Sequence, residues 1–132
     1  MDWTYSCPHC HAVLNPDQSI ILLAEHDELR CLVGLHPQPG NYEVYLPPEV
    51  EMPAGTRWAF FCPVCRQPLT TEISDDLCAI DMTIGGDPHR VYFSRIAGEE
   101  ATFVVSAEGL IKDFGIHTDR YLERLVHSKY MR

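Results

Sequence analysis

The stretch C-P-H-C-H-A-V-L at residues 7–14 returns at residues 62–69 as C-P-V-C-R-Q-P-L. Both copies read Cys-Pro-x-Cys-x-x-x-Leu, so each places two cysteines on one short turn and a leucine four residues beyond the second cysteine. Proline in the second position fixes its backbone φ angle near the value that a turn requires. The repeat therefore predicts two turns of the same shape, one near the start of the chain and one at its middle.

Two such turns can supply all the ligands of one metal ion. Structural zinc takes four ligands in a tetrahedron and is commonly held by thiolates from paired Cys-x-x-Cys turns. We therefore predict one structural Zn²⁺ site, whose ligands are Cys7, Cys10, Cys62 and Cys65. Iron is the alternative occupant, because four thiolates suit both metals. Four free thiols or two disulfides are the remaining alternatives.

The two segments, which we call knuckle 1 (residues 7–14) and knuckle 2 (residues 62–69), resemble those of the zinc-ribbon superfamily, which shares its knuckle geometry with rubredoxins. The resemblance covers residues 7–14 and 57–69, including the strand predicted to enter knuckle 2, and it implies a zinc-ribbon fold. The β-hairpin between the knuckles and residues 77–132 hardly share it. The chain also looks like a group of small bacterial zinc-ribbon proteins without assigned activity. In that superfamily glycine often follows the second cysteine, whereas His11 and Arg66 stand there in this chain. A left-handed backbone is more costly for these residues than for glycine.

The overall composition narrows the classes of partner. The chain has 132 residues and a formal net charge of −9, from 19 acidic and 10 basic side chains. Nucleic-acid backbones bind clustered positive charge, so we expect no nucleic-acid partner. No apolar run approaches the ~20 residues that cross a bilayer, and the start of the chain lacks the apolar segment of a secretory signal. We expect a cytoplasmic protein that binds no membrane, and in that reducing compartment paired cysteines favour metal over disulfides.

Apolar and alternating runs predict strands over much of the chain. The predicted strands are residues 19–25, 29–36, 42–46, 57–61, 77–84, 90–96 and 101–106. The first two form a β-hairpin, and the hairpin insert between the knuckles spans residues 19–46. The last three form a three-strand antiparallel meander, in which Gly85-Gly86-Asp87-Pro88 provides the first turn.

One helix is predicted near the C-terminal end, over residues 119–129. We expect Thr118 to cap it and Asp119 to interact favourably with its dipole. Its apolar stripe consists of Tyr121, Leu122, Leu125 and Val126. That stripe predicts docking on the protein's own sheet, with a second subunit as the alternative. The expected fold is mostly β with one C-terminal helix: a zinc-ribbon region at residues 1–73 and a meander plus helix at residues 74–132, packed as one compact domain.

Other cysteines and histidines have less specific patterns. Cys31 and Cys78 fall on apolar faces of predicted strands, where free cysteine packs as a small hydrophobe. His9 and His11 lie inside knuckle 1 and could compete as metal ligands, but we expect them to be exposed or to orient the sulfurs. The other five histidines show no ligand spacing and are expected in solvent or in the core.

No set of residues predicts an enzyme. Asp75-Asp76 and Glu99-Glu100 are paired carboxylates in predicted turns, where solvated acids are expected rather than general acids and bases. Neither a nucleophile elbow nor a phosphate-binding glycine loop is present in the sequence. A metal site closed by four thiolates also leaves no open position for substrate. We therefore expect no catalytic residues and no small-molecule substrate.

These observations favour a non-enzymatic zinc-binding protein that acts as a protein-interaction or regulatory module. Its partner is expected to be another protein or a second copy of the chain. Aromatic side chains that gather around the insert and knuckle 2 are expected to be mostly core, and any exposed part is the candidate contact surface: Tyr42, Tyr45, Trp58, Phe60 and Phe61. A rubredoxin-like iron electron carrier and a thiol-based redox sensor are the alternatives.

Overall fold

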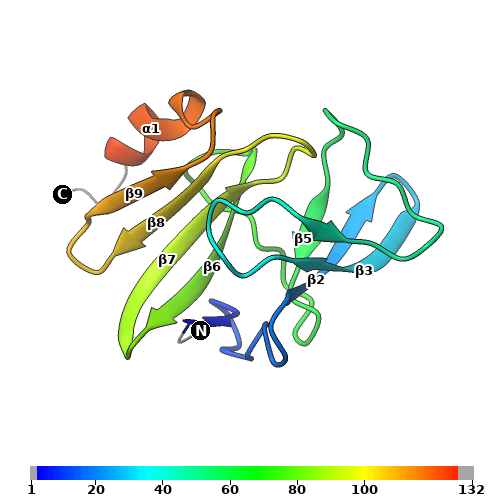
Figure 1. Cartoon of the computed structure of the whole chain (residues 1–132), viewed down its shortest axis with the longest axis horizontal. Coiled ribbons are helices and arrows are strands. Elements are labelled where there is room, and N and C mark those ends of the chain that lie inside the picture. Colours follow the sequence, from blue (N-terminus) through cyan, green and yellow to red (C-terminus); the bar gives the residue numbers. More distant parts are fainter. Residues whose placement is uncertain (1–2, 128–132) are drawn as a thin grey trace.

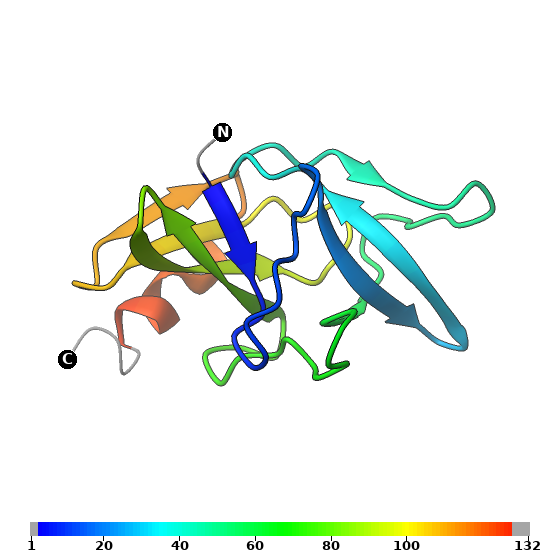
Figure 2. The ribbon, with the colours of Figure 1, turned by 90° about the horizontal axis from the view of Figure 1, so that it is seen from below.

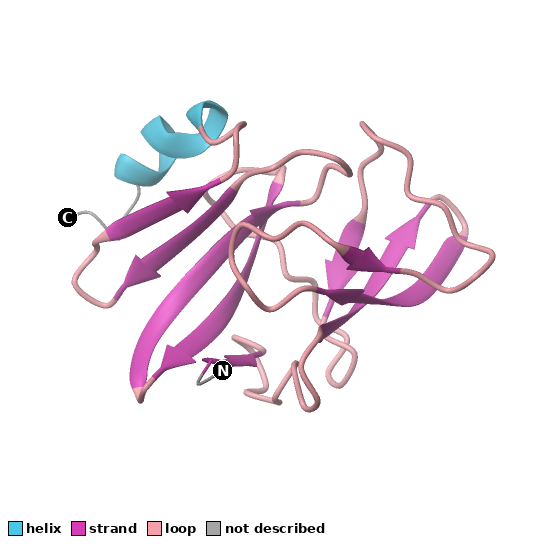
Figure 3. Ribbon diagram, in the orientation of Figure 1, coloured by secondary structure: helices cyan, strands magenta, loops and turns pink. Residues whose placement is uncertain are grey.

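The structure, a computed structural model, describes residues 3–127. Within them the chain forms nine strands and one helix (Figure 3). The strands are β1 (Trp3–Ser6), β2 (Ile20–His26), β3 (Leu29–Leu35), β4 (Val44–Tyr45), β5 (Ala59–Phe61), β6 (Leu77–Ile84), β7 (Asp87–Ser94), β8 (Thr102–Ser106) and β9 (Ile111–Phe114), and α1 spans Asp119–Val126. The prediction of a mostly β fold with one C-terminal helix is confirmed.

The strands form two antiparallel sheets that lie side by side (Figures 1 and 2). The small sheet has the order β4-β3-β2-β5, and the large sheet has the order β1-β6-β7-β8-β9. A core between the two sheets includes side chains from both, among them Leu22, Val33, Ile80 and Val91. A second core lies between the large sheet and α1.

The predicted hairpin and meander are present, but the large sheet is more extensive than predicted. β2 and β3 pair along their full length, and β6, β7 and β8 follow one another as an antiparallel meander. β9 continues that meander, and β1 joins its other edge by pairing with β6. The sequence analysis missed both, because each has only four residues and too short an alternation to stand out. β1 lies before residue 73 but pairs with β6, which lies after it, so the large sheet contains strands from both predicted regions. The division of the chain at residue 73 stays a prediction.

The first turn of the meander is shorter than predicted. Gly85 and Gly86 alone form it, with φ angles of 55° and 91°, and Ile84 pairs directly with Asp87. Two residues with positive φ are typical of the tight hairpin turn whose twist matches the strands. Pro88 therefore lies inside β7, where β8 does not reach it because their pairing begins one residue later.

The large sheet buries both of its faces, and α1 covers one of them. Along β6, Ile80 and Met82 face the small sheet, whereas Leu77 and Ala79 face the helix. The buried helix residues are Tyr121 and Leu125, whereas Val126 is exposed. The prediction that the helix docks on its own sheet is confirmed, and residues 128–129 of the predicted helix lie outside the described part of the chain.

The predicted helix cap is wrong. Thr118 has a helical backbone, with φ −67° and ψ −25°, and its side chain accepts no hydrogen bond from the helix. Its hydroxyl instead donates to Oδ2 of Asp113 at 3.1 Å, in β9. Thr118 is buried, so it fixes the helix to the edge of the large sheet rather than satisfying the first turn.

The two halves of the chain repeat the same arrangement of strands. Residue pairs of the small sheet have counterparts 58 residues later in the large sheet. The pair Leu23↔Leu32 corresponds to Asp81↔Arg90. The pair Gly34↔Tyr45 corresponds to Tyr92↔Phe103. The first strand of each half is exchanged, because β1 pairs with β6 and β5 pairs with β2. Each knuckle follows one of these exchanged strands, so each leads the chain from one sheet into the other.

Candidate metal centre

The two knuckles have the same backbone structure. Ser6 and Phe61 end the entering strands β1 and β5. In each knuckle the first cysteine makes two backbone hydrogen bonds across the turn: Cys7 N to Ala12 O at 3.0 Å and His11 N to Cys7 O at 2.9 Å, then Cys62 N to Gln67 O at 3.1 Å and Arg66 N to Cys62 O at 2.9 Å. The sequence repeat therefore reports a repeated structure, as predicted.

The chain leaves each knuckle by bonding to the other sheet. The carbonyl of Leu14 accepts a hydrogen bond from Ile21 N at 2.7 Å in the small sheet, and the carbonyl of Leu69 accepts one from Ala79 N at 2.8 Å in the large sheet. Both leucines are 1% exposed. The repeated leucine thus anchors each knuckle between the sheets, which explains its place in the pattern.

The residue after the second cysteine adopts the left-handed backbone that glycine would favour. His11 has φ 65° and Arg66 has φ 63°. Without glycine there, each position is strained by up to about 1–2 kcal/mol relative to an ordinary backbone. Both side chains are exposed, so the strain is maintained by the backbone bonds of the turn rather than by burial.

The four cysteine sulfurs lie together where the two knuckles meet. All four Sγ atoms are within 4.8 Å of one another. The Sγ atoms of Cys7 and Cys65 are 3.7 Å apart, and those of Cys10 and Cys62 are also 3.7 Å apart. A zinc ion with sulfurs at about 2.3 Å requires tetrahedral edges of about 3.8 Å. The cluster therefore has the dimensions and the donor set of a tetrahedral thiolate metal site.

Backbone amides already point at the buried sulfurs. The Sγ of Cys7 accepts from His9 N and Cys10 N at 3.3 and 3.5 Å. The Sγ of Cys62 accepts from Val64 N and Cys65 N at the same two distances. Such donors stabilise thiolate ligands of a metal. Both first cysteines are fully buried, whereas Cys10 is exposed.

The two buried thiols of the cluster have pKa values shifted in opposite directions. Burial raises the pKa of Cys7 to about 12. Burial also opposes ionisation of Cys62, but the amides of Cys65 and Val64 and the neighbouring thiols lower the pKa of Cys62 to about 7. The two equivalent positions differ because hydrogen bonds with the neighbouring thiols raise the pKa of Cys7 and lower that of Cys62. Thiolates this close together would repel one another, and a bound cation would offset that repulsion.

Histidines do not join the cluster. Among residues 3–127, the four cysteines are the one group of three or more Cys, His, Asp or Glu whose ligand atoms lie this close. His9 instead places Nε2 3.1 Å from the carbonyl oxygen of Pro68, so it connects knuckle 1 to knuckle 2. His11 is exposed.

The two remaining cysteines lie in strands. Cys78 is fully buried, and burial raises its pKa to about 12, so its thiol is kept protonated. The prediction of core packing is confirmed for this residue. Cys31 is half-buried at the edge of the same core, and burial raises its pKa as well.

The expectation for the paired acids is wrong at Glu99, whose side chain is only 4% exposed. It accepts hydrogen bonds from Ser94 at 2.6 Å and from Tyr121, and it pairs with Arg120 at 2.6 Å. Burial alone would raise the pKa of Glu99, but these partners together lower it. The sequence analysis missed this network because Arg120 and Tyr121 belong to the distant helix.

One sequence signal for the repeat was overlooked. Trp3 and Trp58 are the two tryptophans of the chain, and they precede Cys7 and Cys62 by the same four residues. The aromatic residues Tyr5 and Phe60 also correspond, and both are buried. A repeat of Trp-x-aromatic-x-Cys-Pro-x-Cys would have predicted β1 as the counterpart of β5.

Comparisons with protein-family models, with curated proteins and with solved structures give no match to this chain. The zinc-ribbon resemblance therefore stays a prediction that rests on the knuckles, and the four cysteines can be described as a cluster able to hold a metal ion. Among the described residues, α1 is too short to span a bilayer.

Proposed function

We propose that the four-cysteine cluster binds one zinc ion with a structural role, and that the chain is a non-enzymatic protein-interaction or regulatory module. The observation that supports it most directly is the placement of four sulfurs within 4.8 Å on two knuckles of the same structure. Thiolate donors and a closed tetrahedral site favour structural zinc. Four reduced thiols also suit a reducing compartment such as the cytoplasm.

The position of the knuckles supports a structural role for the metal. Knuckle 1 follows a strand of the large sheet, and knuckle 2 follows a strand of the small sheet. A metal bound by both would cross-link the sheets at one end of their shared core. Structural zinc sites contribute directly to folding free energy.

A contact surface is suggested by the outer face of the small sheet. Leu32 and Tyr45 are 54% and 45% exposed on it, and the register places Leu32 beside Leu23, which pairs in turn with Phe61. Trp58 and Phe60 are buried, so they are core as expected. Contiguous exposed apolar side chains on a sheet face are typical of a protein interface.

The repeat strengthens that interpretation. The positions of Leu23 and Leu32 are occupied in the large sheet by Asp81 and Arg90, which form an ion pair at 2.7 Å. Both pairs lie on the outer face of their sheet. At this one position the large sheet therefore has an ion pair, whereas the small sheet has two leucines. The outer face of the small sheet also carries an ion pair nearer the hairpin turn, between Glu25 and Arg30 at 2.7 Å. A protein partner or a second copy would cover that face.

Elemental analysis and an absorption spectrum test the metal assignment, on protein produced without added metal. We expect one zinc per chain and no visible colour. One iron per chain with a red colour would establish the rubredoxin-like alternative, and protein that folds with no metal would refute the proposal. Zinc that is released by mild peroxide together with disulfide formation would instead support the redox sensor.

Size-exclusion chromatography with light scattering tests the interaction role. A dimer that dissociates on dilution would identify the partner as a second copy. A monomer that binds no protein partner through the outer face of the small sheet would contradict the proposed interaction role, and this outcome does not depend on which metal the cysteines hold.

A further inference from the structure

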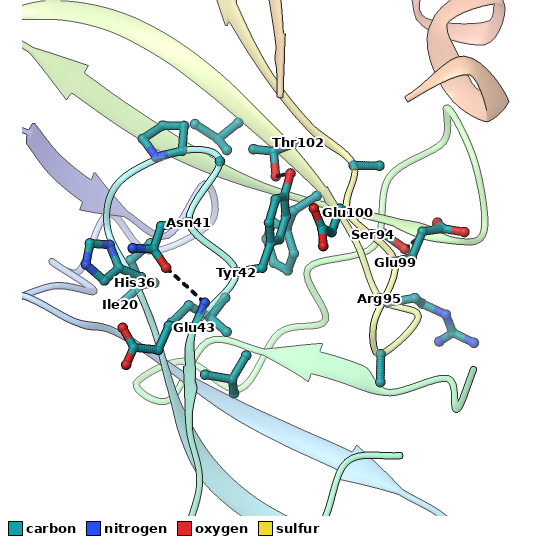
Figure 4. A pocket seen from close by; sticks show the side chains of 18 of the residues that line it. Ile20, His36, Asn41, Tyr42, Glu43, Ser94, Arg95, Glu99, Glu100 and Thr102 are labelled. Atoms are coloured by element: carbon teal, nitrogen blue, oxygen red, sulfur yellow. Dashed lines mark hydrogen bonds between the residues drawn. The ribbon is translucent and has the colours of Figure 1, made fainter. Parts of the chain in front are cut away.

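A cavity of about 430 Å³ lies between the sheets. The β3–β4 and β7–β8 loops, which are equivalent in the two halves, meet over it (Figure 4). Apolar side chains from both sheets form much of its wall: Ile20, Leu35, Phe60, Ile80, Val91 and Phe93. Small-molecule sites commonly have this size and this apolar character, with a few polar groups at defined places.

The equivalent loops place different groups at the same position of the repeat. Tyr42 stands in the first loop where Glu100 stands in the second, 58 residues later. The Tyr42 hydroxyl donates to the carbonyl of Phe114 at 2.9 Å and lies 2.9 Å from Oγ1 of Thr102. These bonds fix the tyrosine ring as a wall of the cavity, beside the Glu100 carboxylate (Figure 4).

The backbone of Glu100 is held while its charge is left free. The ring Nδ1 of His117 accepts a hydrogen bond from the backbone N–H of Glu100 at 2.9 Å. The backbone N–H of His117 donates to the carbonyl oxygen of Glu100, also at 2.9 Å. Within residues 3–127 the Glu100 carboxylate makes no hydrogen bond or ion pair. The proximity of this charge also contributes to the raised pKa of Tyr42, after burial. A carboxylate without an ion-pair partner, beside an aromatic ring, attracts cations.

Three carboxylates and one guanidinium line the cavity: Glu43, Glu99, Glu100 and Arg95. Arg120 neutralises Glu99. The buried Nε of Arg95 has no hydrogen-bond partner among the described residues, and Figure 4 shows the side chains of Arg95 and Glu99 directed away from Tyr42. Glu43 places its carboxylate at the exposed rim. The chain as a whole has a net charge of −9, which also disfavours anionic ligands.

We propose that this cavity binds a small organic cation, an amine with an apolar alkyl or aryl body. The ammonium group would lie between the Glu100 carboxylate and the face of the Tyr42 ring, and the body would fill the apolar space between the sheets. This site is separate from the four-cysteine cluster. It would add ligand recognition to the proposed interaction module.

The test compares two probes of similar shape and opposite charge, phenethylamine and 3-phenylpropionate, on the full metal-loaded chain by NMR titration. We expect saturable shifts of Ile80 and Val91 with the amine and none with the carboxylate. Glu100→Gln keeps the shape of the side chain and is expected to weaken amine binding about tenfold. Glu43→Gln is expected to weaken it less, because that carboxylate lies at the rim.

Glu108→Gln is the matched control, since it removes one charge from an exposed residue of the β8–β9 turn, outside the cavity. Unchanged amine affinity in this variant, with the loss in Glu100→Gln, would support the proposal. Equal binding of both probes, equal affinity in both variants, or shifts confined to residues outside the cavity would overturn it. Absence of any saturable binding by the amine would overturn it too.

Discussion

The two halves of this protein have the same strand pairings but different surroundings. The large sheet is packed on both faces, with the small sheet on one side and α1 on the other. The small sheet has one packed face, and exposed apolar side chains such as Leu32 lie on its outer face. In the large sheet the ion pair of Asp81 and Arg90 stands at the equivalent place. The comparison indicates that the small sheet depends more on its connections, above all on the cysteine cluster.

Removal of the proposed metal is the strongest way to test that difference. Cys62→Ser or a chelator is expected to cost on the order of 5 kcal/mol or more of unfolding free energy, because a structural site contributes its binding energy to folding. Amide hydrogen exchange should show the largest loss of protection in the small sheet and in β1. The core of α1 on β6–β8 contains no residue of either knuckle and should keep more protection.

Cys31→Ser is the control for that experiment. Cys31 is half-buried and lies outside the cluster, so this variant should bind the proposed zinc as the parent protein does and lose about 1 kcal/mol or less. A uniform loss of protection over both sheets on chelation would break the comparison, because it would show that neither half is stable without the other.

The second largest effect is expected at Gly115, where the loop after β9 passes close to the β7–β8 loop. Gly115 has φ 101°, and a Cβ there would lie 2.2 Å from the carbonyl oxygen of Glu100 and 2.6 Å from the Tyr42 hydroxyl. Gly115→Ala is therefore expected to destabilise the protein by about 3 kcal/mol or more in urea unfolding.

Gly55→Ala separates backbone strain from that collision. Gly55 has a similar φ of 90°, but a Cβ there would meet nothing within 4 Å. Its cost should be about 1 kcal/mol, from the left-handed backbone alone. If both variants lost the same unfolding free energy, the backbone around Gly115 and Glu100 would have to move apart at little cost to accommodate the new Cβ atom.

Features that depend on residues close together in the chain could be predicted from the sequence, whereas contacts between distant residues could not. The knuckles were predictable because cysteine, proline and leucine at fixed spacing define a turn within eight residues. The hairpin of β2 and β3 was predictable from its alternation. The pairing of β1 with β6 was not, because the paired residues lie 75 to 81 positions apart in the chain, although the overlooked tryptophan repeat could have indicated that β1 is a strand. The burial of Glu99 was likewise hidden, since only the folded helix brings Arg120 and Tyr121 to it.

The Glu99 network gives a pH dependence specific to the half that has the helix. The pKa of Glu99 is lowered in the folded protein, so its contribution to stability is complete above its unfolded pKa, near 4.5, and is lost as the pH falls through the folded value. In Glu99→Gln this part of the acid-induced loss of stability should disappear. Thermal unfolding between pH 3 and pH 7 measures it, and the loss of stability on acidification should be smaller in the variant than in the parent protein. If the variant lost as much stability on acidification as the parent protein, Glu99 would not be the source of this pH dependence.

The smallest effect on stability is expected from exchanging the surfaces of the two sheets. Leu23→Asp with Leu32→Arg places in the small sheet the ion pair that Asp81 and Arg90 form in the large sheet. Stability should change by about 1 kcal/mol, because Leu32 is already 54% exposed, Leu23 is half-buried, and the new charges lie on directly paired strands. Any self-association or partner binding through this face should be lost, as light scattering would show. A large loss of stability in the monomer would instead mean that the apolar face stabilises its own sheet, and that the difference between the halves reflects folding rather than recognition.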